Sequence, residues 1–144
     1  MVKLVKKMKV IFLDVDGVLN SEQDRFSWTL ESDKHLTLLA CIVRRTNAKI
    51  VVSSSWRGCG LIDTLKKRLN DFSVSVYGKT KDIGERGLEI KEWLDNHKDV
   101  ESFVILDDED FDIAEYFPNN LVKTSTKVGL QKKDAEKCIA ILSK

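Results

Sequence analysis

The sequence has few of the residues that end strands and form tight turns, since it contains one proline and seven glycines. A turn-dense all-β sandwich needs such residues after nearly every strand, so this composition argues against that class. Cysteine is also scarce: Cys41, Cys59 and Cys138 are widely spaced and form no C-x-x-C pair. The spacing argues against a disulfide scaffold and a zinc ribbon, and it favours a reduced, cytoplasmic protein.

Neither a strong charge of one sign nor a long hydrophobic run is present. The 24 basic and 23 acidic residues leave a net charge of +1, so no bulk field attracts nucleic acid or a membrane surface. No stretch approaches the roughly 18 apolar residues that a membrane-spanning helix needs. With 144 residues, 42% of them hydrophobic, we expect one soluble domain over residues 1–144, with no membrane partner and no obligate protein partner.

Short β-branched runs alternate with segments of helical periodicity along the chain. The apolar runs cover residues 10–13, 50–52, 72–77, 103–106 and 121–122. The helical stripes cover residues 36–43, 62–69, 90–97 and 135–142. This alternation predicts an α/β, Rossmann-like fold, with a mostly parallel five-stranded sheet and helices on both faces.

Acidic and hydroxyl side chains directly follow three of the apolar runs. They are Asp14 and Asp16 after the first run, Ser53 and Ser54 after the second, and Asp107 and Asp108 after the fourth. Parallel strands end at a common edge, and ligands bind there where the strand order reverses. Carboxylates gathered at one edge repel one another unless a cation joins them, and oxygen ligands suit Mg²⁺. The sequence therefore predicts a magnesium site.

Other metal-binding and catalytic motifs are excluded because the residues that they require do not stand at the required positions. Asp108 begins a D-x-D-x-D pattern like that of a calcium-binding EF-hand loop, but Ile113 stands where the loop needs glycine and Asn119 where it needs glutamate. The two histidines, His35 and His97, each lie in a helical stretch, so neither an H-E-x-x-H zinc site nor a Ser-His-Asp triad can be assembled.

The Asp14-x-Asp16-Gly17-Val18 segment, the serines after the second run and the later aspartate pair resemble the motifs of the haloacid dehalogenase (HAD) superfamily of phosphotransferases. The resemblance extends over residues 8–142. The segments SSSWR, RGLEIKEWL, VILDDE and GLQKKDA are more specifically similar to the small HAD domain of Swiss army knife RNA repair proteins. A HAD fold is the implied architecture.

The resemblance implies roles for the acidic residues. Asp14 would attack phosphorus and become an aspartyl-phosphate, and Asp16 would protonate the leaving oxygen and then activate water. Mg²⁺ would be held by Asp14, the backbone carbonyl of Asp16, Asp108 and, as a second choice, Asp107. The second aspartate of the first motif favours phosphate esters over carbon–halogen chemistry.

For the phosphate-binding residues the sequence leaves more than one choice. Ser54 is the first choice for the hydroxyl that holds a phosphate oxygen, and Ser53 stays open because it ends the apolar run. The superfamily also places a basic residue near the helix before the fourth strand. Arg86 is the first choice for it, with Lys79 and Lys81 as alternatives.

The site is expected to be open. From Gly17 to Ser32 there are only 16 residues, well below the roughly 50 that a cap domain needs. This points to a minimal, capless form of the fold. Phe26 and Trp28 lie in this stretch, where they would either stack on bases or pack on the core.

These observations together predict a Mg²⁺-dependent phosphatase that hydrolyses a phosphate monoester through an aspartyl-phosphate. Its phosphorylated substrate is expected to be an RNA or DNA end. Two alternatives stay open at this point. One is a small-metabolite or nucleotide phosphatase, and the other is a catalytically silent phosphate-binding or regulatory domain.

Overall fold

The computed structural model describes residues 6–24, 27–58 and 60–144. Five strands form one sheet: β1 (Met8–Leu13), β2 (Lys49–Val52), β3 (Val76–Lys79), β4 (Val100–Asp107) and β5 (Leu121–Lys123). Their order is β3-β2-β1-β4-β5 and every pair is parallel. The α/β, Rossmann-like prediction is confirmed. The order reverses between β1 and β4, which makes their carboxyl ends the expected ligand site.

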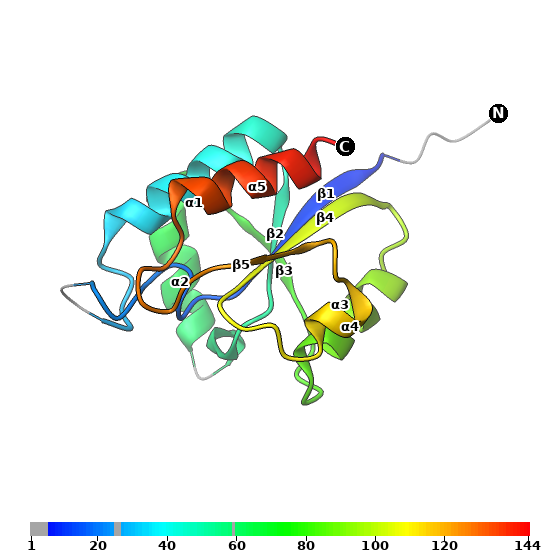
Figure 1. Cartoon of the computed structure of the whole chain (residues 1–144), viewed down its shortest axis with the longest axis horizontal. Helices are drawn as coiled ribbons and strands as arrows, with labels where there is room; N and C mark the ends of the chain where they lie inside the picture. The colour runs from blue at the N-terminus through cyan, green and yellow to red at the C-terminus, as the bar shows by residue number, and fades with distance from the viewer. Residues whose placement is uncertain (1–5, 25–26, 59) are drawn as a thin grey trace.

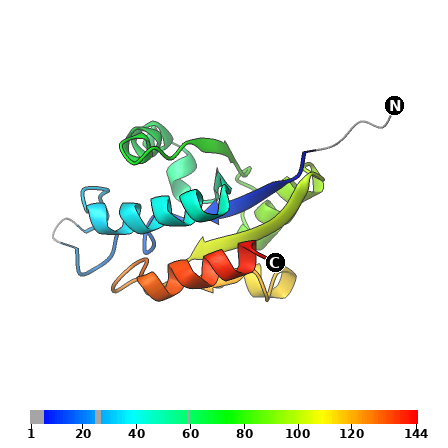
Figure 2. The same ribbon diagram turned by 90° about the horizontal axis from the view of Figure 1, so that it is seen from above.

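Helices cover both faces of the sheet (Figure 1). They are α1 (Asp33–Thr46), α2 (Leu61–Asn70), α3 (Arg86–Asp95), α4 (Ile113–Tyr116) and α5 (Lys132–Leu142). Figure 2 shows α1 and α5 running along the strands, and the two helices contact each other. The helices α1, α2 and α5 pack on one face and α3 and α4 on the other.

Alternation along β1 divides the core between these two faces. Ile11 and Leu13 belong to the larger hydrophobic cluster, with α1, α2 and α5. Val10 and Phe12 belong to the smaller one, where Phe12 meets Trp93 of α3 edge to face at a centroid distance of 5.5 Å. Successive side chains of a strand point to opposite faces, so a strand buried on both sides is apolar throughout.

The predicted third strand, over residues 72–77, is placed too early. In the structure this strand spans Val76–Lys79. The amides of Phe72 and Val74 both donate to the carbonyl of Leu69 at the end of α2, and Ser73 has a φ of +60°. These residues close the helix, so their backbone donors are not available to a neighbouring strand.

The segment between β1 and α1 contains turns and bends, with no helix or strand in its described residues 14–24 and 27–32. It packs against the loop after β5, where Glu22 and Gln23 donate backbone hydrogen bonds to Thr126 and Lys127. Trp28 is 46% exposed, and Phe26 lies outside the described residues.

In the described part of the chain, no helix has the length and apolar character needed to cross a membrane.

Candidate active site

Three of the predicted site residues lie in one row at the carboxyl edge of the sheet. The amide of Asp14 donates to the carbonyl of Leu106 at 2.9 Å, and the amide of Ser53 donates to that of Leu13 at 2.9 Å. These bonds continue the parallel ladders by one residue beyond the strands. Ser53, Asp14 and Asp107 are therefore neighbours on the ends of β2, β1 and β4.

Three carboxyl groups meet at this edge. One carboxylate oxygen each from Asp14, Asp107 and Asp108 can be chosen so that all three lie within 4.8 Å of one another. Burial raises the pKa of Asp14 to about 6, and Arg86 counteracts only part of that shift. Burial, together with repulsion from Asp14, raises the pKa of Asp107 to about 8. Burial therefore disfavours the charged forms of these two carboxyl groups, and a nearby positive charge would favour them.

Arg86 is the basic residue that reaches these carboxyl groups. It begins α3, on the face of the sheet where Asp14 follows Phe12 by two residues. Its Nη1 atom lies 2.6 Å from Oδ2 of Asp107 and 3.6 Å from Oδ1 of Asp14. A guanidinium beside two carboxylates is also suited to bind the oxygens of a phosphate.

The two alternative lysines lie elsewhere. Lys79 donates to the backbone carbonyl of Arg57 at 3.5 Å, and Lys81 Nζ lies 3.4 Å from the carboxylate of Glu92. Of the three basic candidates, the structure brings only Arg86 into contact with Asp14.

The geometry around Asp108 fits a small cation. Gly17 has a φ of +83°, and a Cβ atom built on it would lie 2.7 Å from Cβ of Asp108 and overlap its carboxyl group. Oδ2 of Asp108 accepts a hydrogen bond from Thr126 Oγ1 at 2.8 Å. Glycine thus lets Asp108 approach the end of β1. Three carboxylate donors gathered in one place suit Mg²⁺, a cation that binds oxygen.

Asp16 is not a member of the cluster of three carboxyl groups, and other residues hold its side chain. Its Oδ1 atom accepts hydrogen bonds from Asn20 Nδ2 at 2.9 Å and from Trp56 Nε1 at 3.1 Å. Asn20 Oδ1 in turn accepts from the amide of Gly17 at 2.9 Å. Asn20 and Trp56 were not among the site residues predicted from the sequence. A hint was available in Trp56, which lies in the SSSWR segment.

The two serines have different surroundings. Ser54 Oγ accepts a hydrogen bond from the amide of Trp56 at 3.1 Å and so caps the short 3₁₀ helix η1 (Ser55–Arg57). Ser53 Oγ is fully buried and has no hydrogen-bond partner among the described residues. A buried hydroxyl without a partner is costly, and this one lies in the row that contains Asp14.

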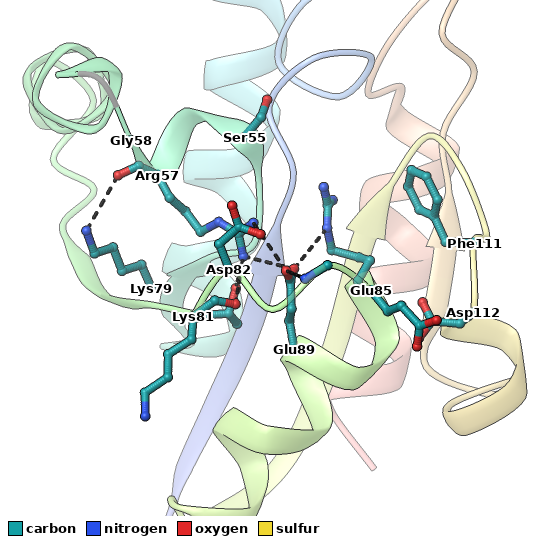
Figure 3. A pocket seen from close by; sticks show the side chains of 13 residues that line it. Ser55, Arg57, Gly58, Lys79, Lys81, Asp82, Glu85, Glu89, Phe111 and Asp112 are labelled. Carbon is teal, nitrogen blue, oxygen red and sulfur yellow. Dashed lines mark hydrogen bonds and ion pairs between the residues drawn. The ribbon is translucent and has the colours of Figure 1, made fainter.

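A cavity of about 940 Å³ opens beside Arg86. Figure 3 shows that Arg57, Lys79 and Lys81 line it together with acidic groups. Arg57 Nη1 lies 2.9 Å from Oε1 of the buried Glu89, which also accepts from the amide of Ile83. Because Glu89 neutralises Arg57, this arginine adds little free positive charge to the cavity.

The family model for the HAD domain in Swiss Army Knife RNA repair proteins matches residues 10–135, a span that runs from β1 into α5. This span contains Asp14, Asp16, Ser53, Arg86 and the aspartate pair at the end of β4. No curated protein and no solved structure matches the chain. The match covers most of the sequence and confirms the predicted resemblance, so the chain belongs to this family of HAD domains.

Proposed function

We propose that this protein is a Mg²⁺-dependent phosphatase that hydrolyses a phosphate monoester through a phosphorylated Asp14. The observation that carries the proposal is the convergence on Asp14 of Ser53, Arg86 and two further carboxylates at the carboxyl edge. Membership of a HAD family supports phosphotransfer chemistry at this place.

The first half-reaction transfers the phosphoryl group to the protein. A carboxylate oxygen of Asp14 forms a bond to phosphorus as the bond from phosphorus to the ester oxygen breaks. Arg86 and the hydroxyl of Ser53 donate hydrogen bonds to phosphoryl oxygens and stabilise the charge that develops on them. Ser53 is preferred to Ser54 for this role because its Oγ has no partner among the described residues and it lies in the row that contains Asp14, whereas Ser54 Oγ accepts the bond that caps η1.

Asp16 moves the protons in both half-reactions. As an acid it protonates the departing ester oxygen, and as a base it then takes a proton from the water that attacks phosphorus. That attack breaks the bond between phosphorus and Asp14, releases inorganic phosphate and restores the carboxylate.

The carboxyl groups of Asp14, Asp107 and Asp108, with the backbone carbonyl of Asp16, would hold the cation. When bound, Mg²⁺ supplies positive charge that offsets these carboxylates and the transferring phosphoryl group. The raised pKa values of Asp14 and Asp107 support this assignment, because burial disfavours their charged forms and a bound cation would favour them.

The proposed substrate is a terminal phosphate on a nucleic acid, RNA in particular. Two observations support it. The family is named for RNA repair proteins. The described residues between β1 and α1 form turns rather than a cap, which leaves room for a polymer end. The pairing of Arg57 with Glu89 instead favours the second candidate, a small phosphate ester, because it reduces the positive charge available to a polymer.

A comparison of substrates decides between them. We would measure kcat/KM at two salt concentrations for a 3′- or 5′-phosphorylated oligoribonucleotide, a mononucleotide and a sugar phosphate, with and without Mg²⁺. Single-stranded polymer contacts predict a slope of about −0.7 per contacted phosphate in log affinity against log salt. Equal turnover of the small substrates, with no added salt dependence for the oligomer, supports the small-ester phosphatase. No Mg²⁺-dependent turnover of any substrate supports a silent binding domain.

A further inference from the structure

The carboxyl group of Asp16 is held from one side by two nitrogen donors. Both hydrogen bonds that the described residues make to it end on Oδ1, one from Asn20 and one from Trp56. A carboxylate oxygen has two lone pairs in the plane of the group, so two N–H donors occupy Oδ1. A proton bound to Asp16 is therefore directed to Oδ2.

Each donor is itself fixed. The side-chain amide of Asn20 is fully buried, and its two ends are distinguished by partners: Oδ1 accepts from the amide of Gly17 and Nδ2 donates to Asp16. The side chain of Trp56 is also buried, and its backbone amide is held by Ser54 Oγ. An indole N–H can only donate, so it favours an acceptor oxygen at Asp16 Oδ1 in every protonation state.

We propose that Trp56 and Asn20 are positioning residues for proton transfer: they hold Oδ1 of Asp16 so that Oδ2 alone exchanges the proton with the ester oxygen and with water. This role rests on the proposed phosphatase function. Two parts of the SSSWR segment then have different roles. Ser53 faces the phosphate, whereas Ser54 holds Trp56, and Trp56 orients Asp16. Proton transfer is faster when the donor is held in the productive orientation than when it samples several orientations.

The test is Trp56→Phe, which keeps a buried aromatic ring and removes the N–H donor. Trp93→Phe is the matched control, because Trp93 is equally buried and packs in the smaller hydrophobic cluster on the other face of the sheet. Asn20→Ser removes the other donor to Asp16 and is an independent test if Trp56→Phe does not fold. Thermal unfolding of each variant checks that the fold is retained.

The readout is kcat/KM for two phosphate monoesters of similar size, nitrophenyl phosphate and benzyl phosphate. A nitrophenolate leaves with little help from an acid, whereas an alkoxide needs the proton. General acid catalysis contributes about 10²–10⁴-fold, so we expect Trp56→Phe to lose at least about tenfold more activity on benzyl phosphate than on nitrophenyl phosphate. Asn20→Ser is expected to shift the ratio the same way, and Trp93→Phe to leave the ratio unchanged.

Equal losses on both esters in Trp56→Phe and Asn20→Ser, or no loss on either, would overturn the positioning role and leave the phosphatase in place. Absence of any Asp14-dependent turnover in the unmodified protein would overturn the proposed function and the positioning role together. Because kcat/KM reports only the steps through loss of the leaving group, a slow second half-reaction does not hide the difference.

Discussion

Gly17 and Asp108 lie so close together that no side chain fits between them. A Cβ atom on Gly17 would overlap the carboxyl group of Asp108, and the φ of +83° at Gly17 is one that other residues adopt only with strain. The glycine after the first motif therefore does more than turn the chain. It allows a residue from the end of β4 to reach the end of β1.

Gly17→Ala is expected to displace Asp108 and to weaken Mg²⁺ binding and turnover by at least about tenfold. Calorimetric titration with Mg²⁺ and a phosphatase assay measure the two effects. Gly60→Ala is the matched control, because Gly60 has a φ of +75° and nothing within 4 Å of an added Cβ. Both variants carry backbone strain of about 1–2 kcal/mol, and only Gly17→Ala adds the collision. Similar Mg²⁺ affinities in the two variants would contradict this account.

Asp14→Asn is expected to abolish turnover while the fold survives, because the amide has nearly the same shape and is a poor nucleophile. The variant should also fail to retain covalent phosphate when mixed with substrate and quenched in acid, as measured by mass spectrometry. Retention of more than a few per cent of the wild-type rate would show that another group attacks phosphorus.

Asp107→Asn and Asp108→Asn are each expected to weaken Mg²⁺ binding, and the double variant to weaken it more than either. Both carboxylates belong to the cluster with Asp14, so each substitution removes one negatively charged oxygen ligand from the same place. Isothermal titration calorimetry gives the affinities. An unchanged affinity in the double variant would place the cation elsewhere.

The metal-free protein is expected to lose stability as the pH rises from about 4 to 8. In the folded state burial raises the pKa of Asp14 to about 6 and that of Asp107 to about 8, from an ordinary value of 3.8. Above about pH 4 the unfolded chain releases both protons, whereas the folded chain keeps that of Asp14 up to about pH 6 and that of Asp107 up to about pH 8, so a rising pH favours unfolding.

Asp107→Asn removes one of these groups, so it should flatten the pH dependence and make the metal-free protein more stable than wild type at pH 8. Thermal unfolding in EDTA at several pH values measures this, with each kcal/mol worth about 4 °C in a chain of this size. A wild-type protein that gains stability toward pH 8 would show that Arg86 outweighs burial at Asp107.

Much of the fold was determined by local patterns in the sequence. The apolar runs at residues 10–13, 50–52 and 103–106 all lie within strands of the sheet, because a strand buried on both faces must be apolar along its whole length. The third strand was misplaced, since an alternating pattern at residues 72–77 does not reveal that α2 takes the amides of Phe72 and Val74. That competition depends on how the helix ends.

For the candidate site, the sequence determined only which residues stand at the ends of the strands. Asp14 and Asp107 follow buried runs, and parallel strands bring their ends to one edge. Only the tertiary structure decided that Arg86 rather than Lys79 reaches Asp14, and that Trp56 supports Asp16 from 40 positions along the chain. Such contacts depend on strand register and on the angle at which each helix packs, and both are set by the burial of the whole core rather than by neighbouring residues.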